Sequence, residues 1–408
     1  MLADLRQRFN RNFSRENYHK LLQVMEKQCG TAVEFRISET PCFLPYALLG
    51  QMCLYGEELI HQLVTRKYLE QSQPSIPAEF NVPQESPHPL FIQVDFGLVK
   101  DRAGALQPKL VELQGFPSLY AYQPVLARTY TEVYGLDRTL SFFLSGLDWE
   151  SYTDLLRRVI VRNHDPENVI LLEIDPQHQK TLPDFLLTEK MLAITTVDVS
   201  QVKKQGRRLY YEKNGVRIPI SRIYNRVIVD ELVRIKPSLE FRFTDDLEVE
   251  WAGHPNWFFR ISKFSLPYLE HECVPETQFL SDFDDIGDLE NYILKPLFSF
   301  AGLGIMLHPT RTSVEAIPKG YRSNYVLQQR MNFEPIIQTP FGMTKAEIRI
   351  MYIWEHQPMP VMTIIRMGRG TMMGVDHNKN MEWVGSSAGL FRNDTECPGR
   401  ISGITRPA

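Results

Sequence analysis

The spacing of apolar residues changes along this chain of 408 residues, and that change constrains the fold more than any other feature. Between residues 14 and 70 apolar side chains return at steps of three and four, which predicts helices. From Leu90 they alternate with polar residues, which predicts strands. Five further apolar and β-branched runs follow, at 292–297, 304–309, 325–331, 345–356 and 358–368. Helices and strands gathered in separate parts of the chain favour an α+β fold.

The pattern divides the chain into four sections. Residues 1–89 form a helical N-terminal region that ends in a proline-rich connection, and residues 90–150 contain a strand pair followed by a helix. Residues 151–262 alternate helix and strand, which favours parallel pairing in an α/β layer, and Asn214-Gly215 there predicts a hairpin turn. Residues 263–408 are rich in strands and end in a region rich in glycine, serine and asparagine.

Composition excludes several classes of protein. Lys plus Arg number 45 and Asp plus Glu 49, so a net charge of −4 offers no attraction to nucleic acid or to an anionic membrane. The N-terminus lacks the apolar core of a signal peptide, and no run of about 18 apolar residues could span a membrane. Five cysteines without a CxxC pair favour free thiols in a reducing cytoplasm. The histidines lack zinc-site spacing, and no GxSxG elbow supports a serine hydrolase.

The segment from Tyr292 to Gly304 is the first that points to chemistry. A strand delivers Lys295, a proline ends the regular pairing, and a loop of small residues follows that includes Ser299, Gly302 and Gly304. Such a loop can lie directly on a polyphosphate with its N–H groups toward the oxygens, and the lysine supplies a compensating charge. The alternative is that this lysine and the glycine-containing hairpin after it are purely structural and bind no phosphate.

Two later strands extend this pattern. The strand that ends at Gln328, Gln329 and Met331 could leave backbone groups unpaired to read the edge of adenine. In the next strand, period two places Glu347 and Arg349 on one face, where they could hold Mg²⁺ and a γ-phosphate. A cross-strand ion pair is the alternative for these two residues.

The early strand pair carries two carboxylates. Glu112 lies in an otherwise apolar strand, where an unpaired charge is expensive, so a divalent cation shared with Asp95 is a suitable partner. For Asp95 the alternative is a cap on the turn at residues 102–104.

Together these segments resemble the ATP-grasp ligases. The strand pair with Asp95 and Glu112 is similar to the metal-binding strands of eukaryotic-type glutathione synthetase and glutathionylspermidine synthetase. Here it lies about 180 residues before the glycine loop, which is the circularly permuted order of those two families.

The resemblance implies an ATP- and Mg²⁺-dependent ligase that joins a small-molecule carboxylate to an amine through an acyl phosphate. It implies that Lys263 and Lys295 neutralise phosphates, and that Gln114 joins the metal ligands. Candidates for contact with the substrate carboxylate or acyl phosphate are Arg226, Arg349 and Arg366. Residues 382–389 are similar to the lid that closes on the acyl phosphate.

Four positions depart from the family pattern. Gln114 replaces an asparagine, Gln93 an arginine, Ser299 a metal-binding glutamate and Gly368 a lysine, and Glu347 could replace the missing carboxylate. These changes favour a different substrate, and they leave a catalytically inactive ATP-binding or scaffold protein as the alternative function. A homodimer is left open.

Overall fold

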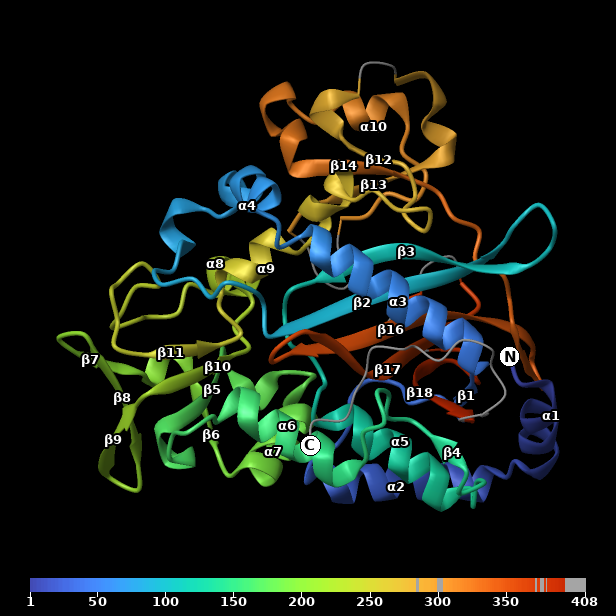
Figure 1. Ribbon diagram of the computed structural model, residues 1–408, viewed down its shortest axis with the longest axis horizontal. Helices are drawn as coiled ribbons and strands as arrows, with labels where there is room; N and C mark the ends of the chain where they lie inside the picture. The colour runs from blue at the N-terminus through green and yellow to red at the C-terminus, as the bar shows by residue number, and fades with distance from the viewer. Residues whose placement is uncertain (284–285, 299–303, 371–372, 375–377, 379, 393–408) are drawn as a thin grey trace.

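An eight-stranded sheet forms the centre of the molecule (Figure 1). The computed structural model describes residues 1–283, 286–298, 304–370, 373–374, 378 and 380–392. Six strands run in the order β1-β18-β17-β16-β2-β3, with β15 beside β16 and β4 beside β18. Their bounds are β1 Cys42–Phe43, β2 Phe91–Lys100, β3 Leu106–Gln114, β4 Leu140–Ser141, β15 Ile337–Thr339, β16 Gly342–Trp354, β17 Pro358–Gly368 and β18 Gly385–Arg392.

One face of this sheet is apolar and lies under α3 (Tyr46–Gln62), which crosses it in Figure 1. Alternate residues of β2 and β16, such as Val94 and Ile348, are fully buried there. Gly56 of α3 permits the close approach, because a Cβ atom at this position would lie 2.1 Å from the Tyr352 hydroxyl. Helices are predicted up to residue 70, and two of them form there: α3 ends at Gln62, and a short α4 (Arg66–Ser72) begins after the N-cap Thr65.

The opposite face is divided. Helices α2 (Arg15–Cys29), α5 (Tyr122–Val133), α6 (Trp149–Ile160) and α7 (Leu182–Leu192) cover its apolar part, which includes Met351 and Ile364. Helix α1 (Ala3–Asn12) packs at the edge of the sheet through Phe9. The remainder of the face carries charged side chains, which are described below.

The α/β section confirms the parallel pairing that the sequence predicts. Its four-stranded sheet has the parallel order β11-β10-β5-β6. The bounds are β5 Val169–Glu173, β6 Thr195–Asp198, β10 Arg222–Asn225 and β11 Glu250–Ala252. A separate sheet holds β7 (Lys203–Gln205), β8 (Arg208–Lys213) and β9 (Val216–Ile220), and the turn between the last two has positive φ at Asn214 and Gly215, as expected.

A small sheet of order β12-β14-β13 stands at the top of Figure 1 beside α10 (Arg311–Glu315). Its strands are β12 Thr277–Phe279, β13 Tyr292–Pro296 and β14 Tyr325–Gln329. The strand predicted at residues 304–309 is wrong: this segment forms an isolated bridge between Met306 and Leu294. The short helix α8 (Val229–Ile235) lies between β10 and β11 in the chain, and α9 (Asn256–Arg260) lies between β11 and the small sheet.

The prediction of a lid at residues 382–389 is also wrong for most of that segment. Residues 385–392 form the buried strand β18, which pairs with β17 on one side and β1 on the other. Small residues are needed there because neighbours approach closely: a Cβ atom on Gly389 would lie 2.4 Å from the Thr363 hydroxyl.

The mixed α+β fold agrees with the sequence prediction, and so does the state of the cysteines that the structure describes. Cys29, Cys42, Cys53 and Cys273 are free and buried. Among the described helices, none combines the length and the apolar composition that a membrane crossing requires.

Candidate functional site

A cavity of about 250 Å³ lies between the small sheet and the charged part of the large sheet. The small sheet contributes Ile293 and Lys295 from β13 and Gln328 from β14. The large sheet contributes Glu112, Lys345, Glu347 and Arg366 from β3, β16 and β17. The remaining lining residues are Val111, Ile305, Leu307, His308, Arg330, Met331, Asn332, Phe333, Met373 and Gly374. The cavity therefore combines charged side chains from both sheets with several apolar side chains.

Strand register explains why these side chains share the cavity. Ile293 lies opposite Gln328 in the antiparallel pair β13–β14, so the two side chains leave the same face. Lys295 follows Ile293 by two residues and joins that face. In β16 the same period aligns Lys345 with Glu347, which lies opposite Arg366 of β17.

Lys295 connects the two sheets. Its Nζ atom donates to Oε1 of Gln328 at 2.5 Å and to the backbone carbonyl of Val111 in β3 at 3.2 Å. Burial lowers the pKa of this lysine to about 8, although Glu112 opposes the shift. A cation held in this way is poised to be stabilised by an anionic ligand.

A β-bulge presents Glu112 to the same cavity. The register between β2 and β3 shifts at Asp95, so that Val111 has no counterpart and its carbonyl turns toward Lys295. The carboxylate of Glu112 accepts a hydrogen bond from Gln114 at 2.7 Å, and its other oxygen lies 3.9 Å from Nζ of Lys263. Burial alone would raise the pKa of Glu112, but nearby lysines and arginines lower it to about 2, so the group is anionic at neutral pH.

Asp95 lies behind this pair at the centre of an ion network. Its two oxygens accept from Nε and Nη2 of Arg349, and one of them also accepts from Arg366 at 2.9 Å. Arg349 completes its fork by donating to Gln93 at 2.6 Å, while Arg366 also donates to Glu347 at 2.5 Å. Arg349 is therefore in an ion pair across two strands, which is the alternative that its sequence position left open.

The network also corrects the other interpretation of Asp95. The turn at residues 102–104 is capped by Asp101, whose Oδ1 accepts from the N–H groups of Ala103 and Ala105 at 2.9 Å. Asp95 is 1% exposed and its oxygens are occupied by arginines, so it is better placed to orient Arg366 than to bind a metal.

The cluster carries a net positive charge. Its cations are Lys263, Lys295, Arg349 and Arg366, and its carboxylates are Asp95, Glu112 and Glu347, which leaves one positive charge in excess. Burial raises the pKa of Glu347, a shift that Arg366 opposes. An anionic ligand would balance this excess.

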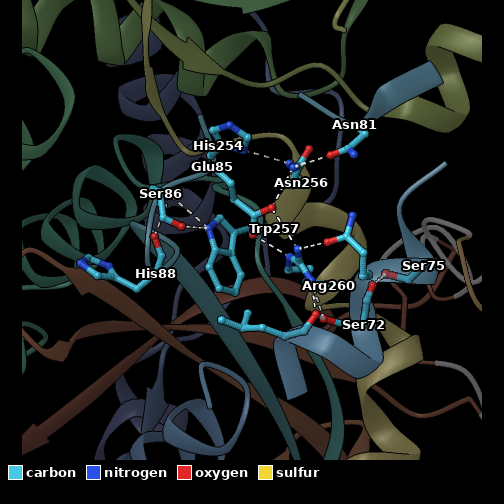
Figure 2. A network of polar contacts seen from close by, with 12 residues as sticks. Ser72, Ser75, Asn81, Glu85, Ser86, His88, His254, Asn256, Trp257 and Arg260 are labelled. Carbon is cyan, nitrogen blue, oxygen red and sulfur yellow. Dashed lines mark hydrogen bonds and ion pairs between the residues drawn. The ribbon is translucent and has the colours of Figure 1, made fainter. Parts of the chain in front are cut away.

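Lys263 reaches the cluster from the 3₁₀ segment Lys263–Tyr268, which follows α9. Figure 2 shows the polar network that holds α9: Arg260 donates to both oxygens of Glu85, and Trp257 donates to Ser86. Arg260 also binds the Leu69 carbonyl, Ser72 and Gln73. The proline-rich connection is therefore fixed against the segment that presents Lys263.

A second cavity, of about 30 Å³, is lined by Glu112, which also lines the first, and by Gln114. Phe116, Phe258 and Phe298 line it together with Lys263. Glu112 thus lines two cavities, one suited to a charged ligand and one small and mainly apolar.

Arg226 lines neither cavity. It follows β10, is 2% exposed, and donates to Asp184 at 2.9 Å, while its guanidinium lies 5.5 Å from the centre of the Phe116 ring. Asp184 also accepts from three backbone N–H groups at the start of α5. Arg226 therefore links the end of β10 to α7 and, through Asp184, to the start of α5.

The remaining predicted residues lie in different places. Met331 lines the large cavity, whereas Gln329 is exposed and its N–H donates to Glu276. Gly304 has a φ of 75° and lies against Pro296. Ser299 and Gly302 fall outside the described residues.

Two features of the cavity were missed in the sequence. Lys345 shares the face of Glu347 and could have been found from the same period of two. Phe333 fits because Gly97 of β2 lacks a side chain, since a Cβ atom there would lie 2.2 Å from the phenyl ring. No pattern in the sequence indicated that contact.

The side chains of this site could hold a metal ion only together with a bound ligand that supplies further oxygen atoms. The described residues contain no group of three or more His, Cys, Asp or Glu side chains able to hold a metal ion. Mg²⁺ in phosphate sites is commonly held by one or two carboxylates together with the phosphates. Glu112, assisted by Gln114 or Glu347, fits that pattern.

The chain matches no protein-family model and no curated protein sequence. Its structure is similar to that of a glutathione synthetase like-effector (GSS30) from Globodera pallida in the apoform, with a TM-score of 0.59 and 10% sequence identity. The match covers 92% of this chain and 96% of that one. At this identity the likeness concerns the fold alone, and the chain has a glutathione synthetase-like α+β fold.

Proposed function

We propose that this protein binds ATP with Mg²⁺ and joins a carboxylate to an amine. The observation that carries the proposal is the 250 Å³ cavity, in which Lys295 and Gln328 of the small sheet face Glu112, Glu347 and Arg366 of the large one. Cations, carboxylates and apolar walls meet there, as a nucleoside triphosphate and its metal would require.

The proposed ATP site follows from the chemistry of the walls. The apolar side chains of Ile293, Met331 and Phe333 suit the base. Lys295 and Lys345 would neutralise phosphates, and Lys263 would approach from the side of Glu112. The excess positive charge of the cluster supports this orientation.

Glu112 is the proposed main ligand of Mg²⁺, with Gln114 and Glu347 beside it. Bound Mg²⁺ would neutralise charge on the phosphate oxygens. In a ligase of this kind the γ-phosphoryl group passes to the substrate carboxylate, and an amine then displaces phosphate. The chain's part is to position these groups and to balance their charge. Arg366 reaches the cavity and is the proposed contact to the acyl phosphate, while Arg349 supports it through Asp95.

The proposal includes a permuted ATP-grasp order. Glu112 precedes Lys295 by more than 180 residues in the chain, yet the two line one cavity. This closeness of an early strand pair and a late lysine strand supports the order of eukaryotic-type glutathione synthetase.

A catalytically inactive ATP-binding protein is the second candidate, and one observation favours it. Arg366, which lines the cavity, is already paired with Asp95 and Glu347, and Arg349 is paired with Asp95. Both of these candidate arginines therefore have carboxylate partners without any substrate. A scaffold protein could retain the cavity and lack turnover.

Two measurements test the proposal. ATP with Mg²⁺ should raise the melting temperature, because a ligand that binds only the native state stabilises it. No shift at millimolar ATP would contradict nucleotide binding in any form. ADP release should then be measured over a panel of acids and amines. Release that requires both an acid and an amine supports the ligase, and nucleotide binding without release for any pair supports the inactive protein.

A further inference from the structure

Gln328 has an amide donor that the protein itself leaves unused. The side chain is 1% exposed and lines the 250 Å³ cavity. Its Oε1 accepts from Nζ of Lys295 at 2.5 Å, and an ammonium group can only donate, so the orientation of the amide is determined. Within the described part of the chain, Nε2 of Gln328 is buried and has no hydrogen-bond partner.

A buried donor without a partner is uncommon because it loses its hydrogen bonds to water and gains none in return. Replacement by an apolar residue of similar size would remove that cost. The unpaired amide therefore indicates that a ligand acceptor completes the site.

The neighbours of Gln328 indicate which part of a ligand lies there. Ile293 is directly opposite on β13, and Met331 follows three residues later; both are apolar lining residues. Lys295 lies on the other side, where phosphate charge would be drawn. A neutral amide between a cation and apolar walls suits the polar edge of a base better than a phosphate.

We propose that Gln328 recognises a purine by donating from Nε2 to the N7 acceptor of its imidazole ring. This inference rests on the proposed function, since it assigns a contact within the proposed nucleotide site. Adenine and guanine both carry N7, whereas pyrimidines lack it, so the contact selects purines.

The decisive probe is 7-deaza-ATP, in which a C–H group replaces N7 and the rest of the molecule is unchanged. Affinities of ATP and 7-deaza-ATP should be measured by calorimetry for the wild type, Gln328→Met and Gln328→Glu. Methionine removes the amide, whereas glutamate keeps an oxygen for Lys295 but replaces the donor by an acceptor. Gln278→Met is the matched control, because Gln278 lies in the neighbouring strand β12, outside the cavity lining, and its side chain donates to Glu276.

The ratio of the two affinities is the readout, because it is insensitive to a general loss of binding. The wild type and the control should prefer ATP by roughly two- to tenfold, the range of one neutral hydrogen bond. Gln328→Met should bind the two nucleotides equally, and Gln328→Glu should lose the preference for ATP or reverse it, because its carboxylate oxygen would face the N7 acceptor. Equal affinities in the wild type, or a preference that survives in both variants, would overturn the N7 contact while leaving ATP binding intact. A wild type that binds neither nucleotide would overturn the proposed function as well.

Discussion

Lys295 should release its proton more readily than an ordinary lysine, and this makes its effect on the free energy of unfolding measurable. Burial lowers its pKa from 10.5 to about 8 in the folded protein. Between these two values the unfolded chain keeps the proton and the folded chain does not, so the free energy of unfolding rises with pH. At 1.36 kcal/mol per pH unit, the gain from this group by about pH 9.5 is about 2 kcal/mol. It is lost again as the pH falls through 8.

The substitution Lys295→Met removes this titration and keeps the length of the side chain. Urea unfolding at about pH 7 and pH 9.5 should show the rise of about 2 kcal/mol in the wild type relative to the mutant. Lys319→Met is the control, because Lys319 is exposed in the same part of the chain and should follow the wild type. A pH dependence shared by all three proteins would refute the buried, cationic lysine.

The same lysine should determine how nucleotide affinity depends on pH. At neutral pH, Lys295→Met should weaken ATP binding by roughly 10- to 100-fold, because a charge-assisted hydrogen bond contributes about 1.5–3 kcal/mol. Above pH 8 the wild type should lose affinity by up to about tenfold per unit, since the cationic form binds phosphate, while the mutant stays constant. Calorimetric titration at both pH values provides the measurement, and equal wild-type affinities would exclude Lys295 from the phosphate site.

Three further substitutions test the surrounding groups. Glu112→Gln should abolish Mg²⁺-dependent ADP release but change ATP affinity only a few-fold; unchanged turnover would remove Glu112 from the metal site. Asp95→Asn should lower the free energy of unfolding by about 3–5 kcal/mol, because two arginines lose a buried partner; a loss below about 1 kcal/mol in urea unfolding would contradict the network. Arg260→Met should cost a similar amount, measured in the same way, whereas Arg311→Met, in an exposed pair, should change stability by less than about 1 kcal/mol.

Local pattern was enough to predict much of this fold. The alternation of β2 and β16 and the Asn214-Gly215 turn depend on neighbouring residues, and the structure agrees with each. The common face of Glu347 and Arg349 follows from the period of two and needed no tertiary information. Prediction failed where packing overrides local pattern. Residues 385–389 are small because neighbouring segments approach them closely, but their composition alone is typical of a loop.

The tertiary structure decided which charges meet. Asp95 and Arg349 are 254 residues apart, and their pairing depends on β2 and β16 being neighbours in the sheet. The same order of strands brings Lys295 to the carbonyl of Val111 and leaves the amide of Gln328 without a partner. Residue type supplied the candidate groups, but the partner of a buried charge is set by long-range strand order and burial, which no local pattern encodes.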